Sequence, residues 1–390
     1  MRIGVILNHF EPHQVPHVTP FAFALSRLRP GWTVDILCST RAEMDFAREI
    51  ATRFDGHQVN ILRLKVPLLF HLSDPLLRQF TFARKVAVLR ANLRRLSQYN
   101  ALIMPEMTSL ALRRSPQMQG VKMIFTGHGA GDLYDNPFGM FDQRVDTFDL
   151  VLLQGRRIAR AMAAEGRLQQ TCHAVIGYPK YEAVPQTPLR LFDDDRPVIV
   201  YNPTQNPRGS SWHKFGTEIL DRLAARDDLN VIFAPHALLF KRSWTRGARL
   251  PKRFRNHPRL KIDPGSRASS DMTYLRAADL YLGDQSSQVY EFINRPRPCV
   301  FLNPDGANWQ GNPSYRSWTF GPVVDRMADF DAALDAALTD FDRWQPAQQA
   351  ALEDDAIAQD APFAKAPASE RGARAIAEFI EQGNIPECWK

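Results

Sequence analysis

The chain has 390 residues, of which 44% are hydrophobic and 23% charged, a composition that excludes a wholly disordered or collagen-like protein. A chain of this length can bury a large core, and two domains are its natural division. It contains no run of about 18 apolar residues, so we expect no transmembrane helix. The cysteines form no CxxC pair, which argues against a disulfide framework or a zinc knuckle and favours a cytoplasmic protein.

The formal net charge is +7, and it is unevenly distributed. Segments 76–96 and 241–261 each carry a run of Arg and Lys without a single acid, whereas the last fifty residues are more acidic. Such a charge balance favours a polyanionic partner, a phosphorylated ligand or an anionic membrane surface. The charge alone does not choose among these three.

Apolar runs and helix-forming segments alternate through the first half of the chain. The predicted strands are 2–7, 33–38, 59–64, 101–105, 121–127 and 149–154, and the predicted helices are 19–29, 41–53, 76–98 and 156–166. The apolar run at 2–7 is too short for the core of a signal peptide, so we interpret it as the first strand. This alternation predicts an α/β fold with a largely parallel sheet.

A segment with three prolines and an acidic run, 181–197, has the composition of a linker between domains. A second alternating series follows it. Its predicted strands are 198–202, 230–234, 259–262, 279–283 and 298–302, and its predicted helices are 213–226, 270–277, 287–293, 331–344 and 369–382. We therefore expect two Rossmann-like domains, 1–180 and 198–344, that face a central cleft, followed by a C-terminal helical segment at 345–390.

Several polar clusters follow predicted strands, where parallel sheets bind their ligands. The first cluster is Gly127-His128-Gly129, directly after strand 121–127. Flanking glycines let a ligand approach the backbone closely, and a histidine there can act as a general base. The alternative is a glycine-rich turn that contains an incidental histidine.

Two further clusters follow the first strands of the second series. His236 comes after strand 230–234 and can donate a hydrogen bond to a phosphate oxygen, or it can simply cap the segment that follows. The polar loop after strand 198–202 contains Asn202, Thr204 and Arg208. Arg208 is a candidate phosphate ligand, and its alternative is a solvated surface arginine.

The last cluster, Asp284-Gln285-Ser286-Ser287, stands between strand 279–283 and a predicted helix that contains Glu291. Serine hydroxyls and free N–H groups at a helix start bind anions. A carboxylate such as Glu291 can accept hydrogen bonds from both ribose hydroxyls of a nucleotide. The alternative is ordinary N-capping by serine.

In this order, the motifs resemble the CDP-glycerol glycerophosphotransferase family of wall teichoic-acid primases and polymerases. The family pattern runs HG, G-x-P-R, Y-A-P-T, H-P and D-Y-S-S before an acidic-Phe pair, and the likeness covers about residues 120–325. The corresponding segments here are Gly127-His128-Gly129, Gly177-Tyr178-Pro179-Lys180, Tyr201-Asn202-Pro203-Thr204, Pro235-His236, Asp284-Gln285-Ser286-Ser287 and Glu291-Phe292. The spacing from Asp284 to Glu291 is also similar to that of UDP-N-acetylglucosamine 2-epimerases.

The resemblance implies a GT-B fold, with an acceptor-side first domain and a second domain that binds a nucleotide-activated donor. It implies metal-independent transfer of glycerol phosphate, or a related polyol phosphate, from a CDP-activated donor to a hydroxyl acceptor in cell-envelope synthesis, with no cofactor. His128 and His236 are then the catalytic residues, and His236, Ser286, Ser287 and Arg208 bind the diphosphate. Glu291, Asn202 and Thr204 bind the ribose and nucleotide.

The basic helix predicted at 76–98 allows two interpretations. Its apolar residues can form a buried stripe with the arginines solvated on the other side. Alternatively, Arg84, Lys85, Arg94 and Arg95 form a surface for an anionic lipid-linked or polymeric acceptor, at the inner face of the membrane. We expect no nucleic-acid partner. Two further function classes stay open: a nucleotide-sugar glycosyltransferase or epimerase, and a non-catalytic protein that binds polyanions or membranes.

Overall fold

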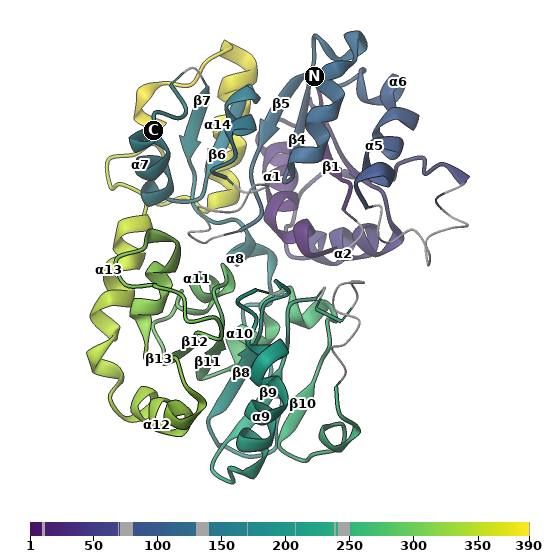
Figure 1. The fold of residues 1–390 in the computed structure, drawn as a ribbon. Coiled ribbons are helices and arrows are strands. Elements are labelled where there is room, and N and C mark those ends of the chain that lie inside the picture. Colours follow the sequence, from purple (N-terminus) through teal and green to yellow (C-terminus); the bar gives the residue numbers. More distant parts are fainter. Residues whose placement is uncertain are drawn as a thin grey trace. The chain divides into compact units, whose positions relative to one another are not determined.

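The computed structural model describes residues 1–9, 12–68, 70, 81–129, 140–169, 171–206, 208–237, 239–240 and 250–389. By its internal contacts the chain divides into two units. The first unit is Met1–Gly129, Asp135–Val184 and Asp354–Lys390, and the bulk of the second unit is Pro185–Glu353. Each unit contains one parallel sheet with helices around it (Figure 1).

The sheet of the first unit has the strand order β3-β2-β1-β4-β5-β6-β7, with every neighbouring pair parallel. Its strands are β1 (Arg2–Leu7), β2 (Thr33–Cys38), β3 (Asn60–Arg63), β4 (Ala101–Met104), β5 (Lys122–Phe125), β6 (Leu150–Leu153) and β7 (Cys172–Val175). Its helices include α1 (Val15–Leu28), α2 (Arg41–Ala51), α5 (Thr81–Ala91), α6 (Leu93–Leu96), α7 (Arg156–Ala164), α8 (Lys180–Ala183) and α14 (Ala368–Gln382), with the 3-10 helix η3 (Met107–Arg114) after β4.

Local sequence accounts for these elements. β1 is a nearly continuous apolar run, buried from Ile3 onward, as expected for a strand covered on both faces. α2 begins with a capping box, in which the Thr40 hydroxyl accepts from the Glu43 N–H and the Glu43 carboxylate accepts from the Thr40 N–H. Two apolar clusters, one on each face of the sheet, form the core of this unit.

The C-terminal helix α14 returns to the first unit and packs against α1. Figure 1 shows it, in yellow, beside the sheet of that unit. The contact is close because Gly372 has no side chain: a Cβ there would lie 2.3 Å from Cε1 of Phe21. The buried Arg371 guanidinium donates to the carbonyl oxygen of Val175 at 2.7 Å, which ties α14 to the end of β7.

The sheet of the second unit has the order β10-β9-β8-β11-β12-β13, also parallel throughout. Its strands are β8 (Val198–Asn202), β9 (Asn230–Phe233), β10 (Leu260–Ile262), β11 (Leu280–Gly283), β12 (Cys299–Leu302) and β13 (Val323–Val324). Its helices include α9 (Ser211–Ala225), α10 (Thr273–Ala277), α11 (Gln288–Phe292), α12 (Phe330–Thr339) and most of α13 (Gln345–Asp355). A third apolar cluster fills this unit.

The predicted α/β fold with two parallel sheets is confirmed, and each predicted strand lies within two residues of an observed one. β7 and β13 were not predicted, because one is partly polar and the other has only two residues. α1 begins at Val15, earlier than predicted, because a proline is tolerated in the first turn of a helix. The cleft between the domains stays a prediction.

The long helix predicted at 76–98 is wrong as a single element, and its first residues, 76–80, lie outside the described part of the chain. The observed α5 ends at Ala91, and α6 begins at Leu93. Asn92 separates them because its side-chain amide hydrogen-bonds the backbone of Lys65 in both directions and also donates to the Val88 carbonyl. Of the helices within the described ranges, none is long and apolar enough to cross a bilayer.

Candidate functional site

The strand order of each sheet places its candidate site. The order reverses between β1 and β4 in the first unit and between β8 and β11 in the second. Ligands of open parallel sheets bind at such switch points, beyond the carboxyl ends of the strands. Two groups of polar residues lie there. We call them the histidine corner (His9, His13, His17, His128 and Tyr178) and the serine corner (Thr204, Ser211, Asp284, Ser286, Ser287 and Glu291).

His128 follows β5, and the preceding glycine fits its turn. Gly127 has a φ of +63°, which disfavours other residues, and a Cβ there would lie 2.9 Å from Cε of Met140. Nδ1 of His128 lies 2.8 Å from the carbonyl oxygen of Pro105. Because a carbonyl oxygen only accepts, Nδ1 carries the hydrogen of this bond and Nε2 keeps a lone pair in the neutral ring. Burial lowers the pKa of His128, so this neutral form prevails at pH 7.

Three more histidines lie around His128 in the loop after β1 and the first turns of α1. The ring centroids of His13 and His128 are 5.8 Å apart, and those of His17 and His128 are 6.3 Å apart. His9 stacks edge-on against His13 at 4.5 Å. Nδ1 of His17 lies 3.2 Å from the Tyr178 hydroxyl in a hydrogen bond. Burial, followed by the charge of Lys180, holds the pKa of His17 well below its ordinary value.

This cluster was missed from the sequence, although a signal was present. His9, His13 and His17 recur at every fourth position, the spacing of one helical face. The loop that carries them is held by Glu43, whose carboxylate accepts from the N–H groups of His9, Ser39 and Thr40 at 2.8 to 2.9 Å. Burial raises the pKa of Glu43 to about 8 despite these bonds.

The basic helix differs from the predicted surface. Arg84 is only 6% exposed, so it does not belong to a surface, and Lys85 turns inward to pair with Glu106 at 3.7 Å. Arg94 is exposed, and Arg95 is half-buried and donates to the Arg63 carbonyl. The helix therefore agrees only in part with the interpretation of a buried apolar stripe and solvated arginines. Its inward-facing side carries Arg84 and Lys85 as well as apolar residues.

Glu106 connects that helix to the histidine corner. Its carboxylate caps η3, accepting from the Thr108 N–H at 2.8 Å and from the Ser109 hydroxyl at 2.6 Å. Its other partner is Lys85, and its charge raises the pKa of His128 while that of Lys85 lowers it. Because Glu106 is committed to these contacts, His128 is the better-placed base of this corner.

Asp284 is the centre of the serine corner. It is fully buried and accepts from the Thr204 N–H at 2.8 Å and from the Ser211 N–H at 3.1 Å. It thereby fixes the loop after β8 to the end of β11, at the switch point. Burial raises the pKa of Asp284 to about 7. Its role is to position the loop that contains Thr204.

The remaining candidates after β8 and β9 occupy different environments. The amide of Asn202 is used inside the protein, since it donates to the Ala234 carbonyl and accepts from the Tyr281 hydroxyl. The side chain of Asn202 therefore joins β8 to residues of β11 and of the loop after β9, and its role as a nucleotide ligand stays a prediction. His236 is half-buried, and its backbone N–H donates to the Pro203 carbonyl at 3.0 Å. Arg208 is exposed.

The serines follow β11 as predicted. Both are half-buried, and the Ser286 hydroxyl accepts from the Gln288 N–H at 3.2 Å, whereas Ser287 makes no capping bond. The helix behind them, α11, has only five residues, so the hydroxyls and backbone amides matter more than its dipole. Glu291 lies on this helix and is 3% exposed. Within the described ranges, no group of three or more His, Cys, Asp or Glu side chains is arranged to hold a metal ion.

Comparison with known proteins places the chain in a class of folds. No protein-family profile matches the sequence. A search of curated proteins found no sequence match either. Solved structures do match along nearly the whole chain, and they share the two-sheet architecture called GT-B. The predicted GT-B-like fold is therefore confirmed.

Three of these structures illustrate the range. MnaA of S. aureus, solved with UDP, has a TM-score of 0.61 at 13% identity, and the match covers 97% of this chain and 96% of the MnaA chain. The UDP-GlcNAc 2-epimerase of Methanocaldococcus jannaschii has a TM-score of 0.57 at 12% identity, with coverage of 98% and 100%. The wall teichoic acid polymerase TagF has a TM-score of 0.59 at 14% identity, with coverage of 98% and 89%. Likeness at these identities is a likeness of fold.

Proposed function

We propose that the protein is a transferase that moves glycerol phosphate, or a related polyol phosphate, from a CDP-activated donor to a hydroxyl acceptor. The observation that carries this proposal is the tautomer of His128. Its Nδ1–H is bound to the Pro105 carbonyl, so Nε2 is the atom that can take a proton from an acceptor hydroxyl. Its lowered pKa keeps that nitrogen unprotonated at neutral pH.

In this proposal the serine corner holds the activated donor. Ser286 and Ser287 offer hydroxyl groups to the diphosphate, and His236 and Arg208 add donors from neighbouring loops. Glu291 binds the ribose hydroxyls through its carboxylate. Thr204 is fixed by Asp284, so the loop after β8 is pre-organised to contact the nucleotide.

The reaction follows from these roles. The acceptor oxygen attacks the phosphorus next to the polyol while His128 Nε2 takes the proton of that hydroxyl. A new bond forms between the acceptor oxygen and this phosphorus. The bond from the same phosphorus to the oxygen that bridges the two phosphates breaks, and CMP leaves with the bonding electrons. Hydrogen bonds to the diphosphate stabilise the charge that develops on the leaving group.

The test is a transfer assay with CDP-glycerol and an acceptor lipid extract, with CMP release followed by phosphorus NMR. We expect CMP release that depends on the acceptor and is lost in His128→Ala, while His213→Ala, on the exposed side of α9, keeps it. Release that is unchanged in His128→Ala would contradict the proposal.

The alternative proposal is a nucleotide-sugar glycosyltransferase or epimerase, and the fold favours it equally, because UDP-GlcNAc 2-epimerases are among the similar structures. The residues favour transfer, since Glu106, the carboxylate whose charge acts on His128 among the described residues, is committed to η3 and Lys85. Turnover of UDP-N-acetylglucosamine without any acceptor would favour the epimerase. A non-catalytic, polyanion-binding protein would bind no nucleotide at all.

A further inference from the structure

An apolar groove runs between α5 and η3 in the first unit. Its volume is about 900 Å³, and α5 and η3 pack against each other along it. Its lining includes the apolar side chains of Phe82, Val86, Leu89, Leu93, Leu110 and Leu112. Phe82 is 66% exposed, which is unusual for a side chain of this size and leaves apolar surface uncovered at the groove.

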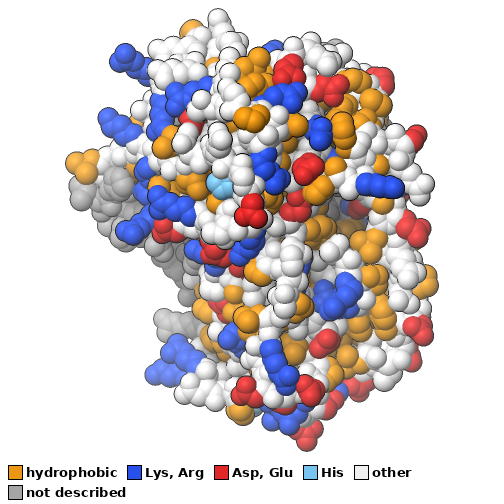
Figure 2. Space-filling model, turned by 180° about the vertical axis from the view of Figure 1, so that it is seen from behind, with side chains coloured by type: hydrophobic (Ala, Val, Ile, Leu, Met, Phe, Trp, Pro, Cys, Tyr) orange, Lys and Arg blue, Asp and Glu red, His pale blue; other side chains and the backbone are white. Residues whose placement is uncertain are grey.

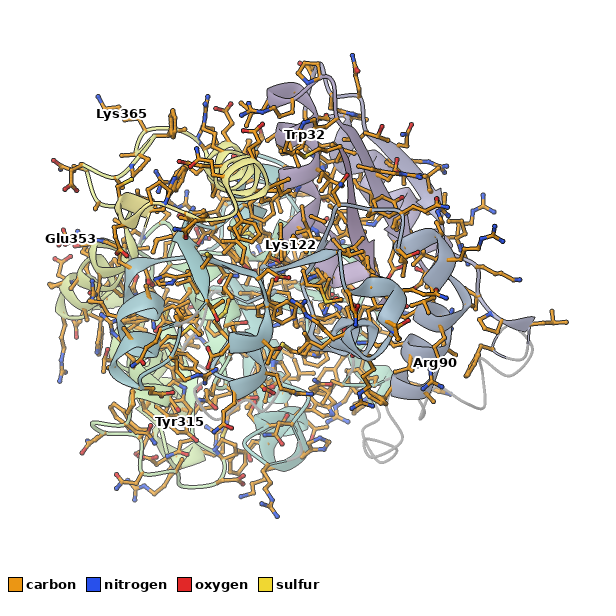
Figure 3. All side chains as sticks on the ribbon, turned by 90° about the horizontal axis from the view of Figure 1, so that it is seen from above. Trp32, Arg90, Lys122, Tyr315, Glu353 and Lys365 are labelled. Carbon is orange, nitrogen blue, oxygen red and sulfur yellow. The ribbon has the colours of Figure 1, made fainter. Side chains whose placement is uncertain are left out.

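The charges at this groove are of one sign. Three arginines line it: Arg144 pairs with Asp142, whereas Arg90 and Arg114 are both exposed and, among the described residues, have no ion-pair partner. None of the residues that line the groove is acidic. Figure 3 shows Arg90 at the outer edge of the first unit. Figure 2, seen from behind, shows Lys and Arg side chains beside hydrophobic ones at the edge where α5 and α6 lie.

The two elements that line the groove, α5 and η3, also carry residues that interact with the histidine corner. Lys85 and Glu106, which form an ion pair, directly precede the lining residues Val86 and Met107 in the sequence. Pro105, one residue before Glu106, is the hydrogen-bond partner of His128. The two walls of the groove thus carry the groups that surround the proposed base.

We propose that this groove, the α5–η3 groove, binds one molecule of an anionic lipid. The hydrocarbon chain lies along Phe82, Val86 and Leu110, and the lipid phosphate lies against Arg90 and Arg114. Long apolar grooves with a cationic rim match such a ligand in shape and charge. That this lipid carries the acceptor hydroxyl rests on the proposed function, whereas the binding itself does not.

Binding of dodecyl phosphate below its micelle concentration, measured by calorimetry, tests the charge of the groove. We expect one saturable site and an affinity about tenfold lower in the double variant Arg90→Glu/Arg114→Glu. Arg94→Glu is the matched control, because Arg94 is exposed on the next helix but does not line the groove. Dodecyl maltoside, which has no charge, should respond little to either variant.

The apolar part of the groove has its own test. Across octyl, decyl and dodecyl phosphate, each added methylene should raise the affinity by up to about fourfold. Ala87→Trp fills the groove and should reduce the affinity for every member of the series. Ala163→Trp, on the exposed side of α7, should leave it unchanged.

Three results would overturn the proposal. One is the absence of saturable binding of dodecyl phosphate, and another is equal binding by Ala87→Trp. The third is binding only to anionic vesicles, weakened as much by Arg94→Glu as by Arg90→Glu, which would indicate a diffuse basic surface. Nucleotide binding is measured on the same samples. Lipid binding without nucleotide binding would refute the proposed function alone, and the reverse result would refute the groove alone.

Discussion

The histidine corner and the serine corner occupy equivalent places in two sheets of similar order, yet their chemistry differs. In both, a buried carboxyl group fixes the loop after the first strand: Glu43 binds the His9 N–H, and Asp284 binds the Thr204 N–H. In both, burial raises the pKa of that carboxyl group, to about 8 and about 7. The fold therefore determines where a ligand can bind and how its loop is held.

The side chains on these loops determine what each corner can do. The histidine corner presents imidazoles with lowered pKa values, which suit proton transfer at neutral pH. The serine corner presents hydroxyls and backbone amides, which suit an anion that must be bound without being protonated. The comparison predicts that variants of the first corner affect turnover and that variants of the second affect nucleotide affinity.

The largest expected effect is on turnover. His128→Ala should reduce kcat by about 10² to 10⁴-fold, the usual contribution of a general base, with little change in nucleotide affinity. In the wild type, kcat/KM should fall only below about pH 6.5, because the pKa of His128 is lowered from that value. A variant that lost nucleotide affinity and kept kcat would reverse the assigned roles of the two corners.

The next effect concerns nucleotide affinity. Ser286→Ala/Ser287→Ala should weaken CDP binding by about 10 to 100-fold, since each hydroxyl donates to a charged oxygen. The measurement is calorimetric titration with CDP. Ser314→Ala, a buried serine in the same unit, is the control and should bind CDP normally. Equal affinity for CDP in the double variant and the control would contradict binding of the diphosphate at the serine corner.

The raised pKa of Asp284 predicts that the stability of the protein depends on pH. Its pKa is about 7 in the folded protein and near 3.8 when unfolded, so between these values the native state holds a proton that the unfolded state has lost. The free energy of unfolding should therefore fall as the pH rises from about 4 to about 7, by at most about 1.4 kcal/mol per pH unit. Asp284→Asn should remove this contribution in urea unfolding experiments.

Asp228 supplies the control for that experiment. The hydrogen bond from Arg226 lowers the pKa of Asp228, so it does not titrate between pH 4 and 7. Asp228→Asn should keep the wild-type slope over this range. If Asp284→Asn kept it as well, Asp284 would be ionised in the folded protein throughout.

The last prediction concerns the contact between α14 and α1 in the first unit. Gly372→Ala places a Cβ against Phe21, so α14 must shift on α1, and we expect a loss of about 1 to 3 kcal/mol. The readout is urea unfolding with CDP binding measured in parallel, which should not change. Gly31→Ala has no atom within 4 Å of the new Cβ and serves as the control. An equal loss in both variants would mean that the α1–α14 contact is unimportant.

Strand positions were predictable because buried parallel strands are short apolar runs bounded by polar residues, as in β1 and β8. The return of α14 to the first unit was not predictable, because it depends on the fit of Gly372 to Phe21, far away in sequence. The break at Asn92 depends on the backbone of Lys65 in the same way.

The candidate site, too, was predictable from the sequence only in part. His128 and the two serines follow strands, so the sequence placed them at the carboxyl ends correctly. The other three histidines were missed because their proximity to His128 depends on the order of the strands in the sheet. They follow β1, and the neighbouring strands β1 and β4 are far apart in sequence. The inward orientation of Arg84 and Lys85 also depends on contacts that no local pattern encodes.

The most direct test of the central claim is a thermal-shift panel on the wild type and Glu291→Ala with CDP-glycerol, CDP-ribitol, CDP, CMP and UDP-N-acetylglucosamine. A ligand at about 100 times its dissociation constant stabilises a protein by roughly 2.7 kcal/mol. We predict that the cytidine diphosphate compounds stabilise the wild type and that this stabilisation is lost in Glu291→Ala. The control is Glu218→Ala, at an exposed position of α9, which should keep it. Stabilisation by the uridine compound alone, or by no nucleotide, would contradict the account.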